Sequence, residues 1–205
     1  MTRSDVIGAV PIKPFQAAKR RLQEVLTPTK RASVSRELAA RTIEALQMAG
    51  AIPLILAADE EVAQWGHDQG LAVILDVQSD LNAAAGLAVA EAHRQQRPWL
   101  VIHVDLPMLT QDVLGRATSL VTQRQPVIAP SSDGGSPLLG SDRSRFDFAY
   151  GPGSFQRHLR LLAIDSPVVL IDPALAIDLD GPDDLAALRH RVPWLAEMTD
   201  TLPPS

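Results

Sequence analysis

The sequence contains no cysteine, which excludes disulfide bonds, cysteine metal sites and thiol catalysis. It also has no hydrophobic run close to the ~20 residues that a membrane-spanning helix needs. The hydrophobic stretch Val6–Val10 has only the length of a strand and runs into Pro11, so it does not resemble the core of a signal peptide. We therefore expect a cytoplasmic protein with no membrane partner.

Positive charge is scarce as well. The net charge of -5 and the pI of about 5.5 argue against a nucleic-acid partner. Only three of the 19 basic residues are lysines, namely Lys13, Lys19 and Lys30, and all lie near the predicted first strand. Lysine is a compact charge that suits phosphate, so Lys13 and Lys19 are candidate phosphate ligands.

Length and hydrophobic patterning predict one α/β domain. The chain of 205 residues is 46% hydrophobic and has no repeat or linker, so we expect a single domain over residues 1–198 and a frayed tail over 199–205. Strands that alternate with helices predict a three-layer, doubly wound, mostly parallel sheet. The predicted strands are 6–10, 52–57, 72–75, 100–104, 127–129, 168–171 and 176–179, with a local strand at 136–139. The predicted helices are 29–48, 60–69, 82–95, 111–123, 154–163 and 183–190. The irregular stretch 131–153 is expected to carry substrate-specific structure rather than core.

Three short acidic segments follow hydrophobic runs that have the length of buried strands. Asp105 ends the first run directly before a proline, Asp133 follows the second, and Asp178 and Asp180 close the third. Ligands of α/β sheets bind outside the carboxyl ends of the strands, and Mg²⁺ prefers hard oxygen ligands. Since Asp178 and Asp180 are two residues apart, an extended chain places both carboxylates on one side. Together with Asp105 they predict a metal site, although single carboxylates at such positions commonly form turns or caps.

The loop after the first predicted strand concentrates basic residues. Pro11–Leu22 contains Lys13, Lys19, Arg20 and Arg21, in the place where doubly wound folds hold phosphate groups. It matches neither the Walker A nor the Gly-x-Gly-x-x-Gly pattern, so it predicts neither an ATPase nor a dehydrogenase. The alternative is an ordinary exposed loop.

Two further loops precede predicted helices. In Ser79–Asn82, the asparagine is expected either to cap the following helix or to face a nucleobase or ribose. In Gly151–Ser154, free amides, a helix dipole and a hydroxyl would form an anion site. The alternative for this second loop is a Gly-Pro turn in which Ser154 is an ordinary N-cap.

Taken together, these motifs resemble the 2-phospholactate guanylyltransferase family, which makes the first activated intermediate of the deazaflavin coenzyme F420. The resemblance extends from about Val6 to Arg191, with the motifs in the same order. The segments that carry it are Val10–Pro14, Ala18–Leu22, Asp80–Asn82, His103–Pro107, Ser132–Ser136, Gly151–His158 and Asp178–Leu185. It implies a nucleotidyltransferase fold like that of the molybdenum-cofactor guanylyltransferases, GTP and Mg²⁺ as co-substrate and metal, and a homodimer.

The resemblance also implies roles for single residues. Asp105, Asp178 and Asp180 match the metal-binding acids, while Lys19 and Arg21 match contacts to the triphosphate. The implied binding residues are Pro11, Lys13 and Asn82 for the nucleotide, and Ser136, Gly151, Gly153 and Ser154 for the acceptor and its phosphate. An anionic acceptor oxygen attacks the α-phosphorus of GTP and needs no general base, so the protein mainly positions groups and neutralises charge.

One loop departs from the family pattern. The family usually has Asp-Gly-Gly-Thr-Asn where this chain has Asp133-Gly134-Gly135-Ser136-Pro137, and proline has no N–H to donate. Relatives accept 2-phospholactate, phosphoenolpyruvate or 3-phosphoglycerate, all small phosphorylated carboxylic acids. Because Ser136 leaves more room and offers a hydroxyl partner, we expect 3-phospho-D-glycerate as the acceptor. The alternatives are a sugar-phosphate or molybdopterin nucleotidyltransferase and a nucleotide-sensing domain without catalysis.

Overall fold

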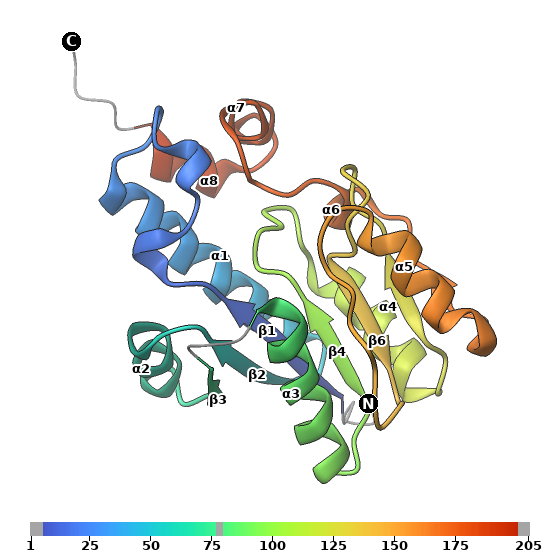
Figure 1. The fold of residues 1–205 in the computed structure, drawn as a ribbon. Helices are drawn as coiled ribbons and strands as arrows, with labels where there is room; N and C mark the ends of the chain where they lie inside the picture. The colour runs from blue at the N-terminus through green and yellow to red at the C-terminus, as the bar shows by residue number, and fades with distance from the viewer. Residues whose placement is uncertain (1–5, 77–79, 201–205) are drawn as a thin grey trace.

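The computed structural model describes residues 6–76 and 80–200, which form one seven-stranded sheet with helices on both faces (Figure 1). In chain order the strands are β1 (Ile7–Ile12), β2 (Ile52–Ala57), β3 (Ala72–Leu75), β4 (Trp99–Ile102), β5 (Val127–Ala129), β6 (Leu138–Ser141) and β7 (Val168–Val169). Their spatial order is β3-β2-β1-β4-β6-β5-β7. All neighbours are parallel except β6, which is antiparallel to both β4 and β5. The expected mostly parallel, doubly wound sheet is confirmed.

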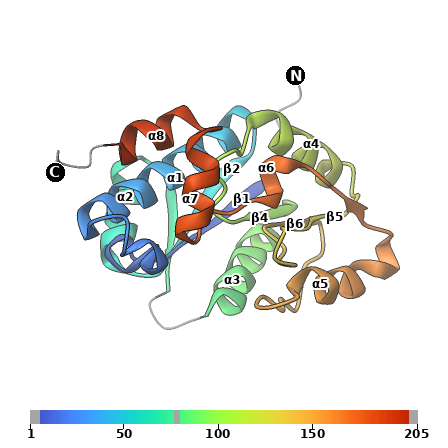
Figure 2. The same ribbon diagram turned by 90° about the horizontal axis from the view of Figure 1, so that it is seen from above.

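Helices cover the two faces of this sheet and produce three layers (Figure 2). The helices are α1 (Pro28–Met48), α2 (Glu60–Asp68), α3 (Leu81–Arg94), α4 (Gln111–Thr122), α5 (Ser154–Leu162), α6 (Pro173–Ala176), α7 (Pro182–Arg189) and α8 (Pro193–Thr199). The cluster of buried residues on one face includes α1, α2, α4 and α6, and the cluster on the other face includes α3 and α5. Several helices begin at a side-chain cap, such as Thr27, which accepts from the Lys30 amide, and Asp59, which accepts from the Val62 amide.

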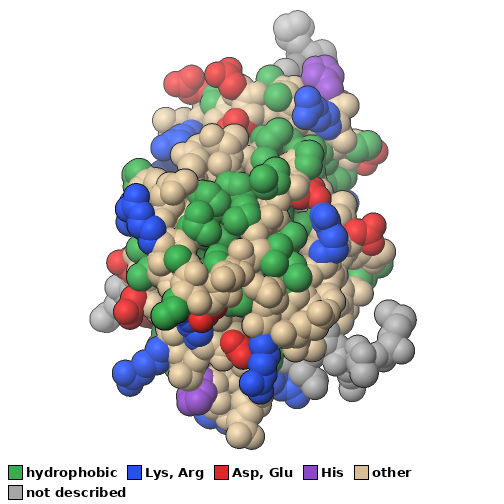
Figure 3. Space-filling model, turned by 90° about the vertical axis from the view of Figure 1, so that its right-hand side faces the viewer, with side chains coloured by type: hydrophobic (Ala, Val, Ile, Leu, Met, Phe, Trp, Pro, Cys, Tyr) green, Lys and Arg blue, Asp and Glu red, His purple; other side chains and the backbone are tan. Residues whose placement is uncertain are grey.

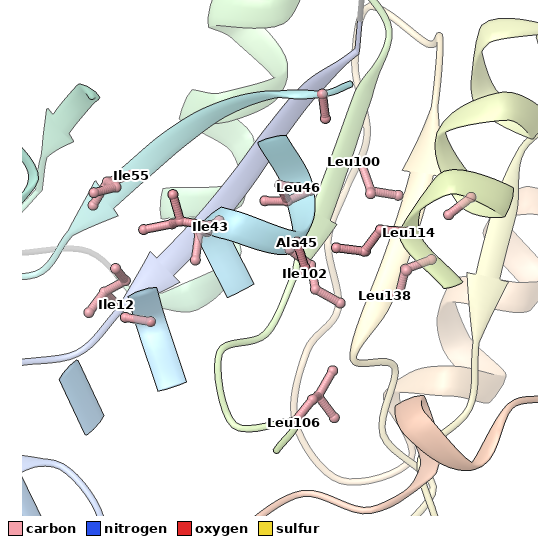
Figure 4. Packing of buried hydrophobic residues seen from close by; sticks show 14 of the residues in the cluster. Ile12, Ile43, Ala45, Leu46, Ile55, Leu100, Ile102, Leu106, Leu114 and Leu138 are labelled. Atoms are coloured by element: carbon pink, nitrogen blue, oxygen red, sulfur yellow. The ribbon is translucent and has the colours of Figure 1, made fainter. Parts of the chain in front are cut away.

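The alternation of side chains along the strands divides the core between the layers. In β1, Val10 and Ile12 face the layer of α1, whereas Ile7 and Ala9 face the layer of α3. Figure 4 shows the first of these clusters, in which α1 and α4 pack over β1, β2, β4 and β6. Because β4 is buried on both faces, all four of its residues are hydrophobic.

A third cluster lies outside these two layers, on the side of α1 that faces away from the sheet. There α7 and α8 pack against α1 and against the basic loop that precedes it. Its fully buried members include Leu22 from that loop, Leu179 from the acidic segment and Leu195 from α8. The cluster therefore joins the basic loop to the acidic segment.

The structure corrects three of the predicted elements. No strand forms over 176–179 among the described residues, because α6 extends to Ala176 and the segment that follows pairs through a single backbone bond. The local strand at 136–139 is β6, which inserts between β4 and β5 in the middle of the sheet. The stretch 131–153 therefore contains core, since every residue of β6 is buried.

The frayed tail was predicted to begin at residue 199, but the structure places residue 199 in a helix. Helix α8 extends through Thr199, which is buried and donates a hydrogen bond to the Leu195 carbonyl. Asp200 forms an ion pair with Arg189 of α7. Residues 201–205 lie outside the described residues. Within the described part of the chain, no helix has the length and hydrophobicity to cross a membrane.

Gly140 of β6 offers a test of this packing. A Cβ atom at Gly140 would lie 2.8 Å from side-chain carbons of Leu100 and Val121 and 3.1 Å from the Trp99 carbonyl oxygen. Gly140→Ala is therefore expected to lower the free energy of unfolding by about 1–3 kcal/mol, measured by denaturant titration. The matched control is Gly115→Ala in α4, where nothing lies within 4 Å and where a gain of about 0.5–1 kcal/mol is expected. A Gly140→Ala protein as stable as its parent would contradict the tight packing of β6.

Candidate active site

Three carboxylates meet beyond the carboxyl end of β4. Asp105 follows this strand, and Asp178 and Asp180 follow α6. One oxygen atom from each lies within 4.8 Å of the others. A backbone hydrogen bond of 2.8 Å from Leu179 N to Asp105 O joins the two segments. Because Leu179 is buried in the third hydrophobic cluster, the residues on either side of it present their carboxylates on the opposite side.

Two basic residues from the loop after β1 lie against these acids. The Nζ atom of Lys19 is 3.6 Å from carboxylate oxygens of both Asp105 and Asp180, and its side chain is only 9% exposed. Arg21 approaches Asp180 at 3.7 Å, with a side chain that is 79% exposed. Lys19 has a left-handed backbone with φ of 53°, a conformation that L-residues adopt rarely. The structure thus brings Lys19, Arg21 and the three acids into one charge cluster.

The cluster shifts the pKa values of its members in opposite directions. Burial alone would raise the pKa of Asp105, but Lys19, with help from His103, a backbone hydrogen bond and Lys13, holds it below its ordinary value. Burial, reinforced by the charges of Asp105 and Asp180, raises the pKa of Asp178 to about 6. Asp178 is therefore the acid that is hardest to keep ionised without a cation nearby.

A cavity of about 360 Å³ opens beside the cluster. Its walls come from the loop after β1, the end of β2, the start of α3 and the segment after β4. Among the lining residues are Pro11, Lys13, Lys19, Leu81, His103 and Asp105. Pro11 and Lys13, the residues expected to bind the nucleotide, therefore line the same cavity as Asp105 and Asp180.

Asn82 has a different local role from the one expected. The N-cap of α3 is Asp80, whose side chain accepts from the amides of Asn82 and Ala83. The side-chain oxygen of Asn82 instead accepts from the Tyr150 amide at 2.6 Å. Asn82 thereby connects α3 to the loop that begins at Gly151. Ser79, also part of the predicted motif, lies outside the described residues.

The helix start at Gly151–Ser154 is shaped by bonds within the protein. Gly153 is the N-cap residue and has a left-handed backbone with φ of 70°, so glycine suits this position. The Ser154 amide donates to the Gly151 carbonyl, and the Phe155 amide donates to the Gly134 carbonyl. Two amides at the start of α5 are therefore already bonded within the protein.

The Ser154 side chain belongs to a buried chain of hydrogen bonds. His158 Nε2 accepts from the Ala149 amide at 2.7 Å, so in neutral His158 the proton lies on Nδ1. Nδ1 then donates to the Ser136 hydroxyl at 2.7 Å, and Ser136 donates to Ser154 at 3.0 Å. Burial, followed by the charges of Arg157 and His103, lowers the pKa of His158 to about 4 and keeps it neutral. Because the Ser154 hydroxyl accepts from Ser136, its own proton remains available for donation to a further group.

The remaining polar residues of the two loops have internal partners. Asp133 accepts from the Ser131 hydroxyl and from the Gly135 amide, which fixes the turn. Arg157 donates to the carbonyls of Ala149 and Pro152. These two side chains shape the loops around the site.

Sequence reasoning did not assign a role to His103, His158 or Tyr150. The available signal was the alternation Phe146, Phe148, Tyr150, which has the two-residue period of an extended segment. In the structure these rings pack in a row, with Phe148 stacked on Tyr150 at 5.5 Å between centroids.

The charge cluster fits a divalent cation. Its three carboxylates offer hard oxygen atoms from two segments, which is the ligand type that Mg²⁺ and related ions prefer. Mutual repulsion and burial disfavour their joint ionisation, as the raised pKa of Asp178 indicates, so a cation would relieve a cost that the fold itself creates.

This cost predicts the behaviour of Asp178→Asn. The folded-state pKa of Asp178, about 6, is raised above the ordinary value of 3.8, so ionised Asp178 destabilises the metal-free protein above pH 6. As the pH falls from about 6 toward 3.8 this cost disappears. Asp178→Asn is therefore expected to raise the Tm in EDTA at pH 7.5, with a gain that shrinks in acid, and to lose the Tm increase that Mg²⁺ produces.

The matched control is Asp183→Asn, which removes an exposed acid at the start of α7. This variant is expected to show no gain in Tm and to keep the response to Mg²⁺. Equal Tm values for Asp178→Asn and the parent in EDTA at pH 7.5 would contradict the electrostatic account.

Comparisons with known proteins identify the family of this chain. Residues 6–189 match the family described as guanylyl transferase CofC like. The chain is 30% identical to phosphoenolpyruvate guanylyltransferase of Rubrobacter xylanophilus, over 90% of this chain and 93% of the relative. It is also 30% identical to 2-phospho-L-lactate guanylyltransferase of Archaeoglobus fulgidus, over 85% of this chain and 80% of the relative.

Solved structures support the same fold. A Desulfovibrio desulfuricans G20 protein, provisionally assigned as a nucleotide-diphospho-sugar transferase, superposes with a TM-score of 0.78 at 18% identity and covers 95% of both chains. A nucleotidyl transferase from Methanothermobacter thermautotrophicus superposes with a TM-score of 0.65 at 14% identity, covering 93% of this chain and 98% of its own. The chain thus belongs to the CofC-like guanylyl transferase family and is a nucleotidyltransferase enzyme.

Proposed function

We propose that this enzyme transfers GMP from GTP to a small phosphorylated carboxylic acid, releasing pyrophosphate, in coenzyme F420 biosynthesis. The observation that carries the proposal is the charge cluster at the mouth of the cavity. Three acids from two segments converge there with Lys19, which is largely buried and within 3.6 Å of two of them. A site that only sensed a nucleotide would have little need for such a costly arrangement.

The reaction forms one phosphorus–oxygen bond and breaks another. A phosphate oxygen of the acceptor attacks the α-phosphorus of GTP, and the bond to the β-phosphate bridging oxygen breaks as pyrophosphate leaves. The attacking oxygen is already anionic, so no proton has to be removed. The protein contributes by positioning the acceptor and GTP and by neutralising their charge.

The residues of the site divide between these two tasks. We assign Asp105, Asp178 and Asp180 to a Mg²⁺ ion, which when bound neutralises charge on the phosphates. Lys19 and Arg21 are assigned to the triphosphate. The positive charge of Lys19 also offsets the negative charges of Asp105 and Asp180. This arrangement supports a role for Lys19 in the same reaction centre.

The nucleotide is assigned to the cavity beside β1 and α3, and the acceptor to the loops at 133–137 and 151–154. Ser136 already donates to Ser154 and accepts from His158, so in this proposal Ser154 rather than Ser136 donates to the acceptor. Pro11, Lys13 and Leu81, the neighbour of Asn82, line this cavity, which supports the assignment.

The identity of the acceptor is a more specific part of the proposal. Relatives of about 30% identity are named for phosphoenolpyruvate and for 2-phospho-L-lactate, which supports an acid of this size. Pro137 replaces the asparagine that the family usually has, and its carbonyl accepts from the His103 amide at 2.9 Å. This altered loop keeps 3-phospho-D-glycerate as our prediction for the preferred acceptor.

A turnover panel tests the proposal. Pyrophosphate release is measured with GTP and Mg²⁺ against phosphoenolpyruvate, 2-phospho-L-lactate and 3-phospho-D-glycerate, with a hexose 1-phosphate as the comparison. We expect turnover with at least one acid and the highest kcat/KM with 3-phospho-D-glycerate. A clear preference for 2-phospho-L-lactate would contradict the acceptor assignment, turnover with the sugar phosphate alone would contradict the substrate class, and no turnover would favour a sensing role.

Lys19→Ala tests the division of roles. Because Lys19 is assigned to the triphosphate, we expect KM for GTP to rise or kcat to fall by about tenfold or more, with a much smaller rise in the acceptor KM. Arg20→Ala is the control, since Arg20 is the exposed neighbour on the same loop. A selective loss of acceptor affinity in Lys19→Ala would instead assign this loop to the binding of the acceptor.

We also propose a homodimer. Figure 3 shows hydrophobic side chains gathered on the face of the molecule that carries α5. The exposed hydrophobic residues of α5 and the segment that follows it are Leu161, Ile164, Val169 and Ile171, with Ile164 and Ile171 more than four-fifths exposed. An exposed hydrophobic surface beside the edge strand β7 supports an interface between two copies.

A further inference from the structure

Two buried polar atoms beside the loops of the acceptor have no hydrogen-bond partner among the described residues. They are Nε2 of His103 and Oη of Tyr150. The two rings are neighbours, with centroids 5.2 Å apart. Buried polar atoms are nearly always bonded in folded proteins, so a pair of unpartnered atoms at one place requires an explanation.

His103 lies between the charge cluster and the loop at 133–137. It follows β4 directly, its amide donates to the Pro137 carbonyl, and Asp105 is two residues further along. His103 is one of the residues that line the cavity. Its side chain makes no hydrogen bond to any of the residues that the structure describes, so packing alone sets the orientation of the ring.

Tyr150 is held firmly on several sides. Its amide donates to Asn82 Oδ1 at 2.6 Å. Its ring stacks on Phe148 with an interplanar angle of 7°, and it meets the edge of His158 at 4.8 Å between centroids. Burial raises the pKa of Tyr150, so its hydroxyl keeps a proton that it can donate. These contacts hold the ring in the row, with its hydroxyl buried.

Packing alone does not account for this hydroxyl. The same row of rings contains Phe146 and Phe148 at two-residue spacing, so phenylalanine fits the row at neighbouring positions. At position 150 a phenylalanine would fill the same space without burying an unbonded oxygen, which is unfavourable. Tyrosine therefore makes sense if its hydroxyl has a partner from outside the chain.

We propose that His103 Nε2 and Tyr150 Oη together bind one oxygen atom of the acceptor's acid portion, either its carboxylate or its hydroxyl, and thereby help to select the acceptor. This inference rests on the proposed function. Both polar atoms are buried, and His103 but not Tyr150 lines the cavity, so the contact requires the imidazole to move and open a path from the cavity to Tyr150 Oη. Among the described residues, no side-chain hydrogen bond of His103 opposes that movement. Neighbouring Pro137 and Gly151 belong to the two loops assigned to the acceptor, so the pair stands between them.

The experiment removes each polar atom and keeps its ring. Tyr150→Phe and His103→Phe are compared with the parent in kcat/KM for the three acids, in KM for GTP and in Tm with and without each acid. A site that hydrogen-bonds a substrate group loses about tenfold or more in kcat/KM when its partner is removed. We expect that loss for the acid, a KM for GTP within about twofold of the parent, and a smaller Tm increase on adding the acid.

The free proteins supply a second readout. Since Tyr150 Oη has no hydrogen-bond partner among residues 6–76 and 80–200, Tyr150→Phe is expected to leave the Tm of the free protein unchanged or to raise it. The matched control is Thr118→Val in α4, where the buried hydroxyl donates to backbone carbonyls, that of Gly115 at 3.1 Å among them. Thr118→Val is expected to lower the Tm and to leave kcat/KM for every acid unchanged.

The pattern of losses identifies the bound oxygen. A similar loss with all three acids assigns the pair to the carboxylate, and a loss only with 3-phospho-D-glycerate assigns it to the hydroxyl. Parent-like kcat/KM values in both variants overturn the inference, as does a Tyr150→Phe protein that loses Tm without losing acceptor response. If the parent turns over none of the acids, the proposed function fails and this inference fails with it.

Discussion

The hydrogen bond from Leu179 N to Asp105 O is the interaction on which the site depends. It is the point where the acidic segment touches the end of β4, and it brings together three carboxylates that repel one another. One backbone bond would be a weak support by itself. The third hydrophobic cluster supplies the rest, because Leu179 is buried there between α1 and α7.

The same cluster also holds the positive half of the site. Leu22 is buried within it, directly after the turn that contains Lys19 and Arg21. The left-handed backbone of Lys19 costs free energy, and the buried anchor beside it helps to maintain that conformation. The C-terminal helices therefore matter to the charge cluster even though α8 contributes no residue to it.

Much of the architecture could be predicted from the sequence, because strand-length hydrophobic runs and amphipathic helices carry a local signal. Strands β2, β3 and β5 match their predicted bounds. The pairing of Asp178 with Asp180 followed from their two-residue spacing, which places both side chains on one side of any extended segment. Asp105 joined them because it lies at the end of a predicted strand. The failed strand at 176–179 shows the limit, since Asp172 caps a short helix there and pairing depends on neighbours that are distant in sequence.

The loops at 133–137 and 151–154 were harder to predict. The bonds of Asn82 to Tyr150 and of Ser136 to His158 join residues far apart along the chain, and no local pattern specifies such pairs. Ser154 was expected to be a simple anion ligand, but its hydroxyl is the last member of a buried chain of donors. Only the tautomer imposed by the Ala149 amide gives that chain a direction.

The antiparallel strand β6 has a consequence for the order in which the protein folds. In the sheet it is the element between the four parallel strands β3-β2-β1-β4 and the pair β5 and β7. The β5–β6 ladder pairs residues that are close in sequence, such as Ala129 and Leu138, so its formation closes a short loop. The β4–β6 ladder pairs Trp99 with Ser141 and Ile102 with Leu138, so its formation closes a longer loop. Loop-closure entropy favours the short closure first. We therefore expect the β4–β6 ladder, which joins the two parts of the sheet, to form after the β5–β6 ladder. Hydrogen exchange of the amides in the two ladders would report this difference.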